Sequence, residues 1–149
     1  MRRLKIVIAV GILSMTPMPF RAQQTGTTKS DETAIRAVVQ RYLHGLKFND
    51  VESLKSAFHP DAKLFFVDDH GGLGMLSQAE WYEQFKGSAG HEEQGELKIV
   101  ALDVTGNASA VKVYEEYPNS TYTDYVSLLR LNGEWRIVNK SYYSAPRQR

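Results

Sequence analysis

No set of side chains in this 149-residue chain identifies a reaction or a ligand. His59 precedes Pro60 where a predicted helix runs into a predicted strand. Its imidazole can act there as a base or bind a ligand, or it can fix the junction through a backbone hydrogen bond. The structural role is the favoured interpretation, and no residue is assigned as catalytic.

The chain has no cysteine, which excludes thiol catalysis, disulfides and cysteine-bound metal sites. Two short clusters hold other metal-ligand types. Asp68-Asp69-His70 lies in a glycine turn, and His91-Glu92-Glu93 lacks the second histidine of a zinc-protease helix. Neither has a partner at a fixed spacing, so we expect solvated loops and no metal. The sequence also lacks a phosphate-binding loop and a nucleophile elbow, and no cofactor is expected.

Aromatic side chains are the main candidate binding groups. Such rings commonly line a pocket for a flat or apolar ligand, and they also fill the core between helices and a sheet. Both interpretations can apply to the same residues. The set comprises Tyr42, Phe58, Phe66, Trp81, Phe85, Tyr125 and Tyr143.

The segment around Asp124 reads as a strand, in which successive side chains point to opposite faces. If Tyr125, Ser127 and Leu129 face a pocket, Asp124 faces away from it. Asp124 would then pair with a cation such as Lys140 across a hairpin, or lie at a subunit contact.

The elements that must position these groups follow from the hydrophobic pattern. An apolar stripe over 34–46 predicts a first helix, capped by Ser30 or Asp31. Asn49 with Glu52 has the spacing of a capping pair for a short second helix. That helix ends at His59-Pro60-Asp61, because proline disfavours helical geometry in the residue before it.

The second half of the chain predicts strands. A strand over 62–68 precedes a glycine turn, and a third helix over 77–86 has a capping box, Ser77 with Glu80. Four strand-like segments follow, over 96–104, 109–117, 121–131 and 135–143. Asn132-Gly133 is a strong signal for a two-residue hairpin. Helices gathered on one face of an antiparallel meander make an α+β fold.

The N-terminus has the layout of a secretory signal. Arg2, Arg3 and Lys5 precede an apolar run over 6–15, and Ala22 is a small residue suited to cleavage. We therefore expect a signal peptide over 1–22, a flexible leader over 23–30, a domain over 31–144 and a tail over 145–149. The protein is predicted to be secreted or periplasmic, with no membrane association after cleavage.

Charge excludes one class of partner. Without residues 1–22, the chain holds 14 basic and 17 acidic residues, a net charge of −3. There is no basic stripe with interleaved aromatic residues, so a nucleic-acid partner is not expected.

The closing segment TDYVSLLRLNGEWRIVNKSYYS, residues 123–144, resembles the last hairpin of the nuclear transport factor 2-like superfamily. Tyr42, Leu43, Asp50, the Phe58–Ala62 junction and the helix at Ser77 are similar to its putative lumazine-binding branch, close to SnoaL-like proteins. The resemblance covers about residues 31–144. It implies a cone-shaped curved antiparallel sheet packed against three helices, also described as cystatin-like. A homodimer is expected on other grounds, because several strands carry apolar and aromatic residues on both faces. This fold hosts enzymes, binding proteins and interaction modules alike.

Ketosteroid isomerases of this superfamily resemble the chain through the first helix and the last hairpin. The resemblance places their helix tyrosine on Tyr42, their general-base aspartate on Phe66 and their oxyanion-hole acid on Ser127. A phenyl ring cannot accept a proton, and a serine hydroxyl is a weaker donor than a neutral carboxylic acid. That reaction is therefore not expected.

Three functions stay open. The first is an exported protein that binds a small apolar or aromatic molecule without catalysis, and it is the favoured one. The second is a SnoaL- or isomerase-like enzyme with a non-standard set, such as His59 with Tyr42 or Asn139. The third is a dimeric interaction module that uses the outer face of the sheet. The expected ligand contacts are Tyr42, Phe58, His59, Phe66, Trp81, Phe85, Tyr125, Ser127 and Asn139.

Overall fold

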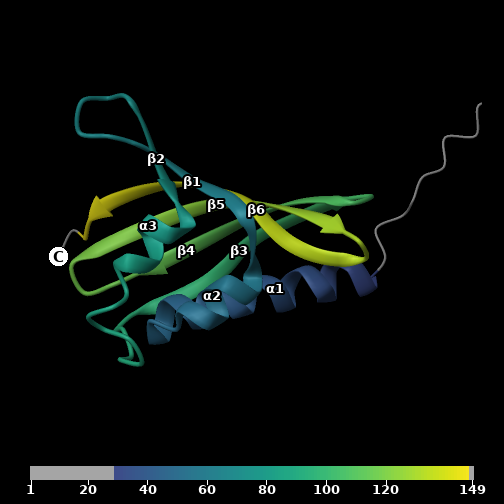
Figure 1. The fold of residues 1–149 in the computed structure, drawn as a ribbon, viewed down its shortest axis with the longest axis horizontal. Helices are drawn as coiled ribbons and strands as arrows, with labels where there is room; N and C mark the ends of the chain where they lie inside the picture. Colours follow the sequence, from purple (N-terminus) through teal and green to yellow (C-terminus); the bar gives the residue numbers. More distant parts are fainter. Residues whose placement is uncertain (1–28, 148–149) are drawn as a thin grey trace, which may run out of the picture.

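A computed structural model describes residues 29–147, and these form helices packed on one sheet (Figure 1). The predicted signal peptide lies outside the described residues, as does most of the predicted leader. Within the described residues, no helix is long and apolar enough to cross a membrane. The elements in chain order are α1 (Lys29–Phe48), α2 (Val51–Ala57), β1 (Phe58–Val67), β2 (Leu73–Ser77), α3 (Gln78–Glu83), β3 (Glu96–Thr105), β4 (Ala108–Glu116), β5 (Ser120–Leu131) and β6 (Glu134–Pro146).

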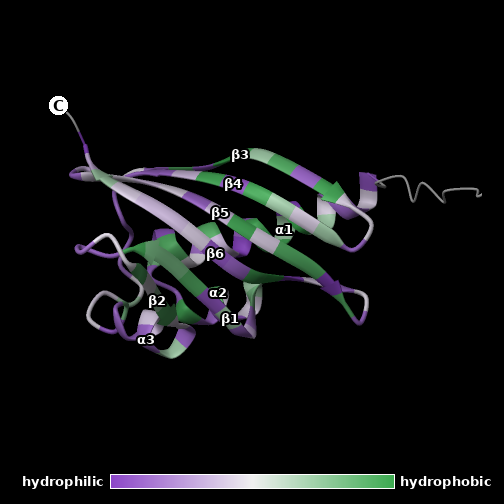
Figure 2. Cartoon of the chain, turned by 90° about the horizontal axis from the view of Figure 1, so that it is seen from above, coloured by the Kyte–Doolittle hydropathy of each residue, from purple (hydrophilic) through white to green (hydrophobic). Residues whose placement is uncertain are grey.

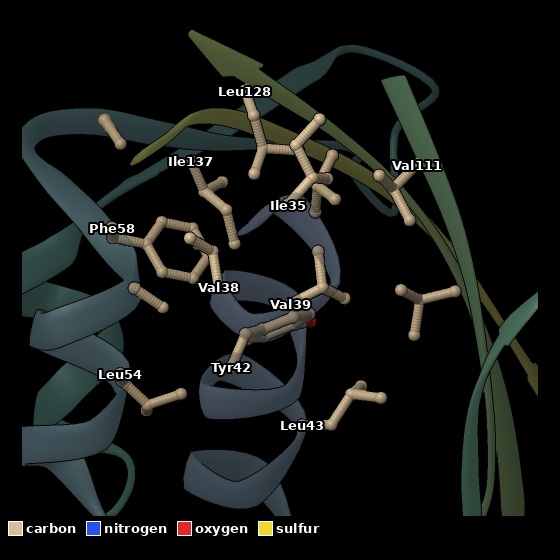
Figure 3. Close-up of a cluster of buried hydrophobic side chains, with 14 of the residues drawn as sticks. Ile35, Val38, Val39, Tyr42, Leu43, Leu54, Phe58, Val111, Leu128 and Ile137 are labelled. Carbon is tan, nitrogen blue, oxygen red and sulfur yellow. The ribbon is translucent and has the colours of Figure 1, made fainter. Parts of the chain in front are cut away.

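Helix α1 is amphipathic as the sequence predicts, although it begins at Lys29, inside the expected leader. Its apolar residues recur at steps of one, three and four, which gathers them on one face. Figure 3 shows this face turned toward side chains that descend from the sheet. The buried residues of the stripe are Ile35, Val38, Val39, Tyr42, Leu43 and Leu46.

The junction of α1 and α2 differs from the prediction by one residue. Asn49 has a φ of 52°, a left-handed conformation that ends α1. Asp50 caps α2 instead, because its side chain accepts hydrogen bonds from the N–H groups of Glu52 and Ser53, at 3.1 and 3.2 Å. The predicted Asn49–Glu52 capping pair is therefore wrong, and Asn49 is free for another role.

The region from 58 to 83 is partly as predicted. The capping box of Ser77 and Glu80 is confirmed, and α3 ends at Glu83, three residues early. Strand β1 begins at Phe58, immediately after α2, and pairs with β2, which the sequence did not indicate. Strand β2 is short and contains Gly74, so it lacks the alternating pattern of a half-buried strand. The β1–β2 hairpin projects from the body in Figure 1.

The sheet has the order β2-β1-β6-β5-β4-β3. The antiparallel meander from β3 to β6 is confirmed, whereas β1 lies parallel to β6. At the β5–β6 hairpin, Asn132 and Gly133 have φ values of 51° and 89°, and Leu131 pairs with Glu134. Two positive φ values are what a type I′ turn requires, which explains the Asn-Gly pair.

The helices cover one face of the sheet, which we call the inner face (Figure 1). Apolar side chains of the strands meet the stripe of α1 there, and several of them are fully buried. Burying one such side chain stabilises the fold by about 1.5–3 kcal/mol. The strand residues of this core include Leu64, Val111, Val113, Val126, Leu128 and Ile137.

Candidate functional site

A cavity of about 290 Å³ lies at one end of the inner face, where the apolar core stops. The end of α1, helix α3, the segment after α3 and strands β1, β4, β5 and β6 all contribute to it. Five of its thirteen lining residues are aromatic, and its charged groups are both acidic and basic. The lining residues are Leu46, Asn49, Leu64, Trp81, Gln84, Phe85, Glu93, Glu115, Tyr117, Ser120, Tyr122, Lys140 and Tyr142.

A buried ionic network lies at the base of this cavity. The Nζ atom of Lys140 is 2.8 Å from Oδ2 of Asp124 and donates a hydrogen bond of 2.7 Å to the hydroxyl of Tyr42. The Tyr42 hydroxyl in turn donates to Oδ2 of Asp124. Asp124 and Tyr42 are fully buried, and Lys140 is 5% exposed. Charges without water are tolerated only when they are paired and hydrogen-bonded in this way.

Glu115 joins the network, and its surroundings raise its pKa. Its Oε1 lies 3.1 Å from the Tyr42 hydroxyl, and Tyr117 donates a hydrogen bond of 3.0 Å to its Oε2. Burial raises the pKa of Glu115 to about 8, although the nearby Lys140 ammonium lowers it. A hydrogen bond with Asp124 also raises this pKa.

The hydrogen-bond inventory supports a neutral Glu115. A hydrogen bond between two carboxyl groups needs a proton on one of them. Oδ1 of Asp124 is buried and has no hydrogen-bond partner among the described residues. A proton on Glu115 is the donor that its hydrogen bond with Asp124 requires. Burial therefore favours the neutral form of Glu115 within this network.

Lys140 is held as a cation. Burial disfavours its charge, but the charge of Asp124 and a hydrogen bond with it act the other way, and the pKa of Lys140 is raised. The ammonium also lies 5.0 to 5.4 Å from the ring centres of Tyr42, Trp81 and Tyr142. Of its three N–H donors, two bond to Asp124 and Tyr42, and no other acceptor for it occurs among the described residues. The third N–H is available to a ligand in the cavity.

A β-bulge aims Lys140 into the cavity. Trp135 and Ile137 point to the inner face, and strict alternation would send Asn139 there next. The pairing of β6 with β5 shifts between Ile137 and Asn139, which inserts Val138 as an extra residue. Lys140 therefore takes the inward position opposite Val126. Bulges re-aim side chains in this manner and are common next to active sites.

The structure brings four of the predicted ligand contacts together. Trp81 and Phe85 line the cavity, with ring centres 5.5 Å apart. Tyr42 lies behind Lys140 and contributes its hydroxyl to the ionic network. Phe58 is 1% exposed and packs edge-on against both Tyr42 and Trp81, so it supports the site from the core.

Three other predicted contacts lie on the opposite, outer face of the sheet. Asp124 is fully buried and Tyr125 is 53% exposed, so the predicted orientation of this strand is wrong. Ser127 follows Tyr125 outward, and Asn139 pairs with Ser127. The expected Asp124–Lys140 pair does form, but on the inner face. The inward set is Asp124, Val126 and Leu128, so Val126 and Leu128 are buried in the core while the outward Tyr125 and Leu129 stay exposed.

Phe66, His59 and Tyr143 lie away from the cavity. Phe66 stacks on Tyr142, with ring centres 5.4 Å apart, and Tyr142 rather than Tyr143 lines the cavity. Tyr143 is 69% exposed. The N–H of Asp61 donates a hydrogen bond of 3.2 Å to Nδ1 of His59, which confirms its predicted role at the helix–strand junction.

The two predicted loop clusters have structural partners. Oδ1 of Asp68 accepts hydrogen bonds from the N–H groups of His70 and Gly72, which closes the β1–β2 turn. The carbonyl of His91 accepts a hydrogen bond from Asn49. In residues 29–147, no three His, Asp or Glu side chains gather so as to hold a metal ion.

Hydrophilic and hydrophobic residues alternate along the strands of the sheet (Figure 2), and its outer face carries apolar as well as polar side chains. Tyr125 and Leu129 are exposed on it, and Lys112 lies 5.6 Å from the Tyr125 ring. The expected homodimer would use this face, and it stays a prediction that sedimentation at micromolar concentration tests.

Comparison with known proteins finds relatives of the whole domain. The family model described as "Putative lumazine-binding" matches residues 30–143. An aldolase, FrzH of Cladobotryum sp, is 27% identical over 122 residues, which are 80% of this chain and 96% of that protein. A nuclear transport factor 2-like protein of unknown function from Shewanella baltica has a TM-score of 0.74 at 26% identity, over 82% of this chain and 100% of its own.

A more distant structure shows the fold alone. A protein of unknown function with a cystatin-like fold from Nostoc punctiforme has a TM-score of 0.59 at 15% identity, covering 80% of this chain and 94% of its own. The predicted nuclear transport factor 2-like and cystatin-like fold is thus confirmed.

Proposed function

This chain belongs to the Putative lumazine-binding family, and we propose that its cavity binds a small carbonyl compound and moves a proton at the carbon next to the carbonyl. The observation that carries this proposal is that Glu115 and Lys140 both line one cavity, joined through Asp124 and Tyr42. An acid–base group beside a fixed cation is the minimum that such a reaction needs. The sequence showed no such pair, which is why binding without catalysis was favoured there.

Lys140 is the group that stabilises charge. The carbonyl oxygen of the substrate accepts its free N–H, so the ammonium faces the oxygen on which negative charge develops. Because the pKa of Lys140 is raised, it stays an ammonium and does not attack the carbonyl as a free amine. Asp124 and Tyr42 hold the ammonium in place.

Glu115 is the group that moves the proton. In its ionised form it removes a proton from the carbon next to the carbonyl, and the electron pair passes to the oxygen to give an enolate. The neutral acid then returns a proton to the same carbon, or the enolate attacks an aldehyde and forms a carbon–carbon bond. With a pKa of about 8, about one Glu115 in ten is ionised at pH 7, so the rate rises with pH up to about 8.

The relative named as an aldolase supports this assignment, because an aldol reaction begins with the same enolate. The aromatic wall of Trp81, Phe85, Tyr122 and Tyr142 supports an apolar or aromatic body for the substrate, as the sequence predicts.

The test is deuterium exchange at the carbons next to a ketone, measured by proton NMR in D₂O with a panel of cyclic and aryl ketones. We expect the protein to accelerate exchange, and Glu115→Gln and Lys140→Met each to lower that rate by about 100-fold or more. Lys112→Met on the outer face is the matched control and should leave the rate unchanged. Binding of the ketones without exchange would overturn the catalytic part and support a binding protein.

Export is part of the proposal, on the strength of the signal-like residues 1–22. Mass spectrometry of the chain recovered from its own host tests it, since processing removes about these 22 residues. An intact N-terminus on the recovered chain would contradict it.

A further inference from the structure

The cavity holds a second carboxyl group, at a different depth from Glu115. Glu93 lies in the segment between α3 and β3 and is half-buried, whereas Glu115 is 3% exposed. Both line the same cavity. Glu93 therefore lies at the mouth, and the ammonium of Lys140 lies at the base.

The position of Glu93 is fixed by the end of α1. Its N–H donates a hydrogen bond of 2.7 Å to the carbonyl of Lys47, and Nζ of Lys47 donates one of 2.5 Å to the carbonyl of Glu93. Nδ2 of Asn49 donates a hydrogen bond of 3.0 Å to Oε1 of Glu93. Asn49 reaches it from the left-handed position that ends α1. The carboxylate is thus held by side chain and backbone rather than left on a free loop.

No cation of the described chain neutralises this carboxylate. Within residues 29–147, the carboxylate of Glu93 receives one side-chain hydrogen bond, from Asn49, and forms no ion pair, since Lys47 donates to the Glu93 carbonyl instead. The nearest candidate, Lys47, pairs with Glu92 at 3.4 Å, and Lys140 is committed to Asp124. A half-buried carboxylate that faces a cavity without a cation is suited to a positively charged ligand.

The rings near the mouth favour the same ligand. Tyr117 lies close enough for Glu93 to contribute to the raised pKa of its hydroxyl, after burial and Glu115. The rings of Tyr117 and Tyr122 meet edge to face at 5.9 Å, and Tyr122 lies 6.3 Å from Tyr142. Aromatic faces attract cations, most strongly for quaternary ammonium groups that are easily desolvated.

We propose that the substrate carries an amine or ammonium group several bonds from its carbonyl, and that Glu93 selects it at the mouth of the cavity. This inference rests on the proposed function, since it takes the carbonyl oxygen to lie at Lys140. The cavity has a cation at its base and a carboxylate at its mouth. This arrangement matches an aminoketone whose carbonyl oxygen contacts Lys140 and whose amine contacts Glu93.

Two ketones of the same shape test the proposal. In 1,1-dimethyl-4-oxopiperidinium a charged nitrogen takes the place of one carbon of 4,4-dimethylcyclohexanone. Their dissociation constants are measured by NMR titration at pH 6.5, where Glu115 is neutral. We expect the cationic ketone to bind about tenfold more tightly than the neutral one, because a charge-assisted contact and stacking on the rings are added.

The variant Glu93→Gln keeps an oxygen for Asn49 but removes the charge. It should abolish the preference by weakening the cationic ketone about tenfold and leaving the neutral ketone unchanged. Glu92→Gln, which neutralises the neighbouring exposed carboxylate, is the matched control and should keep the preference. Added salt should reduce the preference in the wild type, since Glu93 is only half-buried.

The outcomes separate this inference from the proposed function. Equal affinity for the two ketones, a preference that survives in Glu93→Gln, or no binding of either ketone overturns it. A preference without deuterium exchange supports the cation site while the catalytic proposal fails. Exchange of the neutral ketone without a preference for the cationic one leaves the catalytic proposal standing and removes this inference.

Discussion

Strands β4, β5 and β6 form both ends of the inner face, and the two ends differ in the residues that point inward. At one end the inward residues are apolar, among them Val113, Val126 and Ile137, and α1 seals them. At the other end the next inward residues are Glu115, Asp124 and Lys140, and a cavity lies beside them. A change of two or three positions along each strand thus separates a dry core from an ionic site.

The difference between the two ends shows how a fold accommodates a site. The apolar end needs only hydrophobic residues of about the right size. The ionic end needs a network in which each buried charge has a partner, since one missing partner leaves an isolated charge. It also needs the bulge at Val138, without which Lys140 would point to the outer face. The core therefore fixes the position of the site, and the bulge provides its cation by turning Lys140 inward.

The largest effect is expected from breaking the ion pair. Lys140→Met leaves the Asp124 carboxylate buried without its cation, which should lower the free energy of unfolding by about 3–5 kcal/mol. Urea denaturation at pH 7 measures it. Adding Asp124→Asn should recover part of the loss, because the isolated charge is removed. A double variant no more stable than Lys140→Met would contradict a coupled pair.

The second expected effect is that the stability of the fold depends on pH, because of Glu115 at the ionic end. An unfolded glutamate ionises near its ordinary pKa, whereas folded Glu115 keeps its proton up to about pH 8. The folded state thus binds more protons between these values, and its stability falls as pH rises through them, by up to about 1.4 kcal/mol per pH unit.

Glu115→Gln should remove this slope, and urea denaturation from pH 5 to 8 measures it. Leu128→Ala, at the apolar end, should cost about 2–5 kcal/mol and keep the wild-type slope. If the slopes of wild type and Glu115→Gln coincide, Glu115 does not hold its proton in the fold.

The smallest expected effect is the change in stability when a tyrosine loses only its hydroxyl group, and two tyrosines can be compared. Tyr42→Phe removes the group that joins Lys140, Asp124 and Glu115, so buried polar atoms lose a partner and stability should fall by about 1–3 kcal/mol. Tyr125→Phe, on the exposed outer face, should change it by no more than about 0.5 kcal/mol. Thermal unfolding of both variants measures the difference, and equal values would mean that the Tyr42 hydroxyl does not stabilise the network.

Local patterns predicted most of the fold. The stripe of α1, the capping box at Ser77 and the Asn132-Gly133 turn each have a local cause, and each is confirmed. Strand β2 and the parallel pairing of β1 with β6 have no local cause, because partners far apart in sequence define them. The cap of α2 was missed by one residue, since Asn and Asp both favour such positions.

The site was predicted less well, for a reason that its strands make clear. Apolar residues occur on both faces of β5, so alternation gave two orientations and burial of Val126 with Leu128 decided between them. One signal was present. Glu115 and Asp124 each lie two residues from a valine on the same face, which is the pattern of a charge placed on a core face.

The sequence by itself determined the class of fold, the aromatic residues Tyr42, Trp81 and Phe85 of the site, and the absence of cysteine chemistry. These follow from residue type and from periods of two and 3.6 residues, which are local properties. The tertiary structure alone decided which face of β5 is buried, that Lys140 points inward and that burial raises the pKa of Glu115. Those features depend on a bulge, on pairing between strands and on burial, which exist only once distant segments meet.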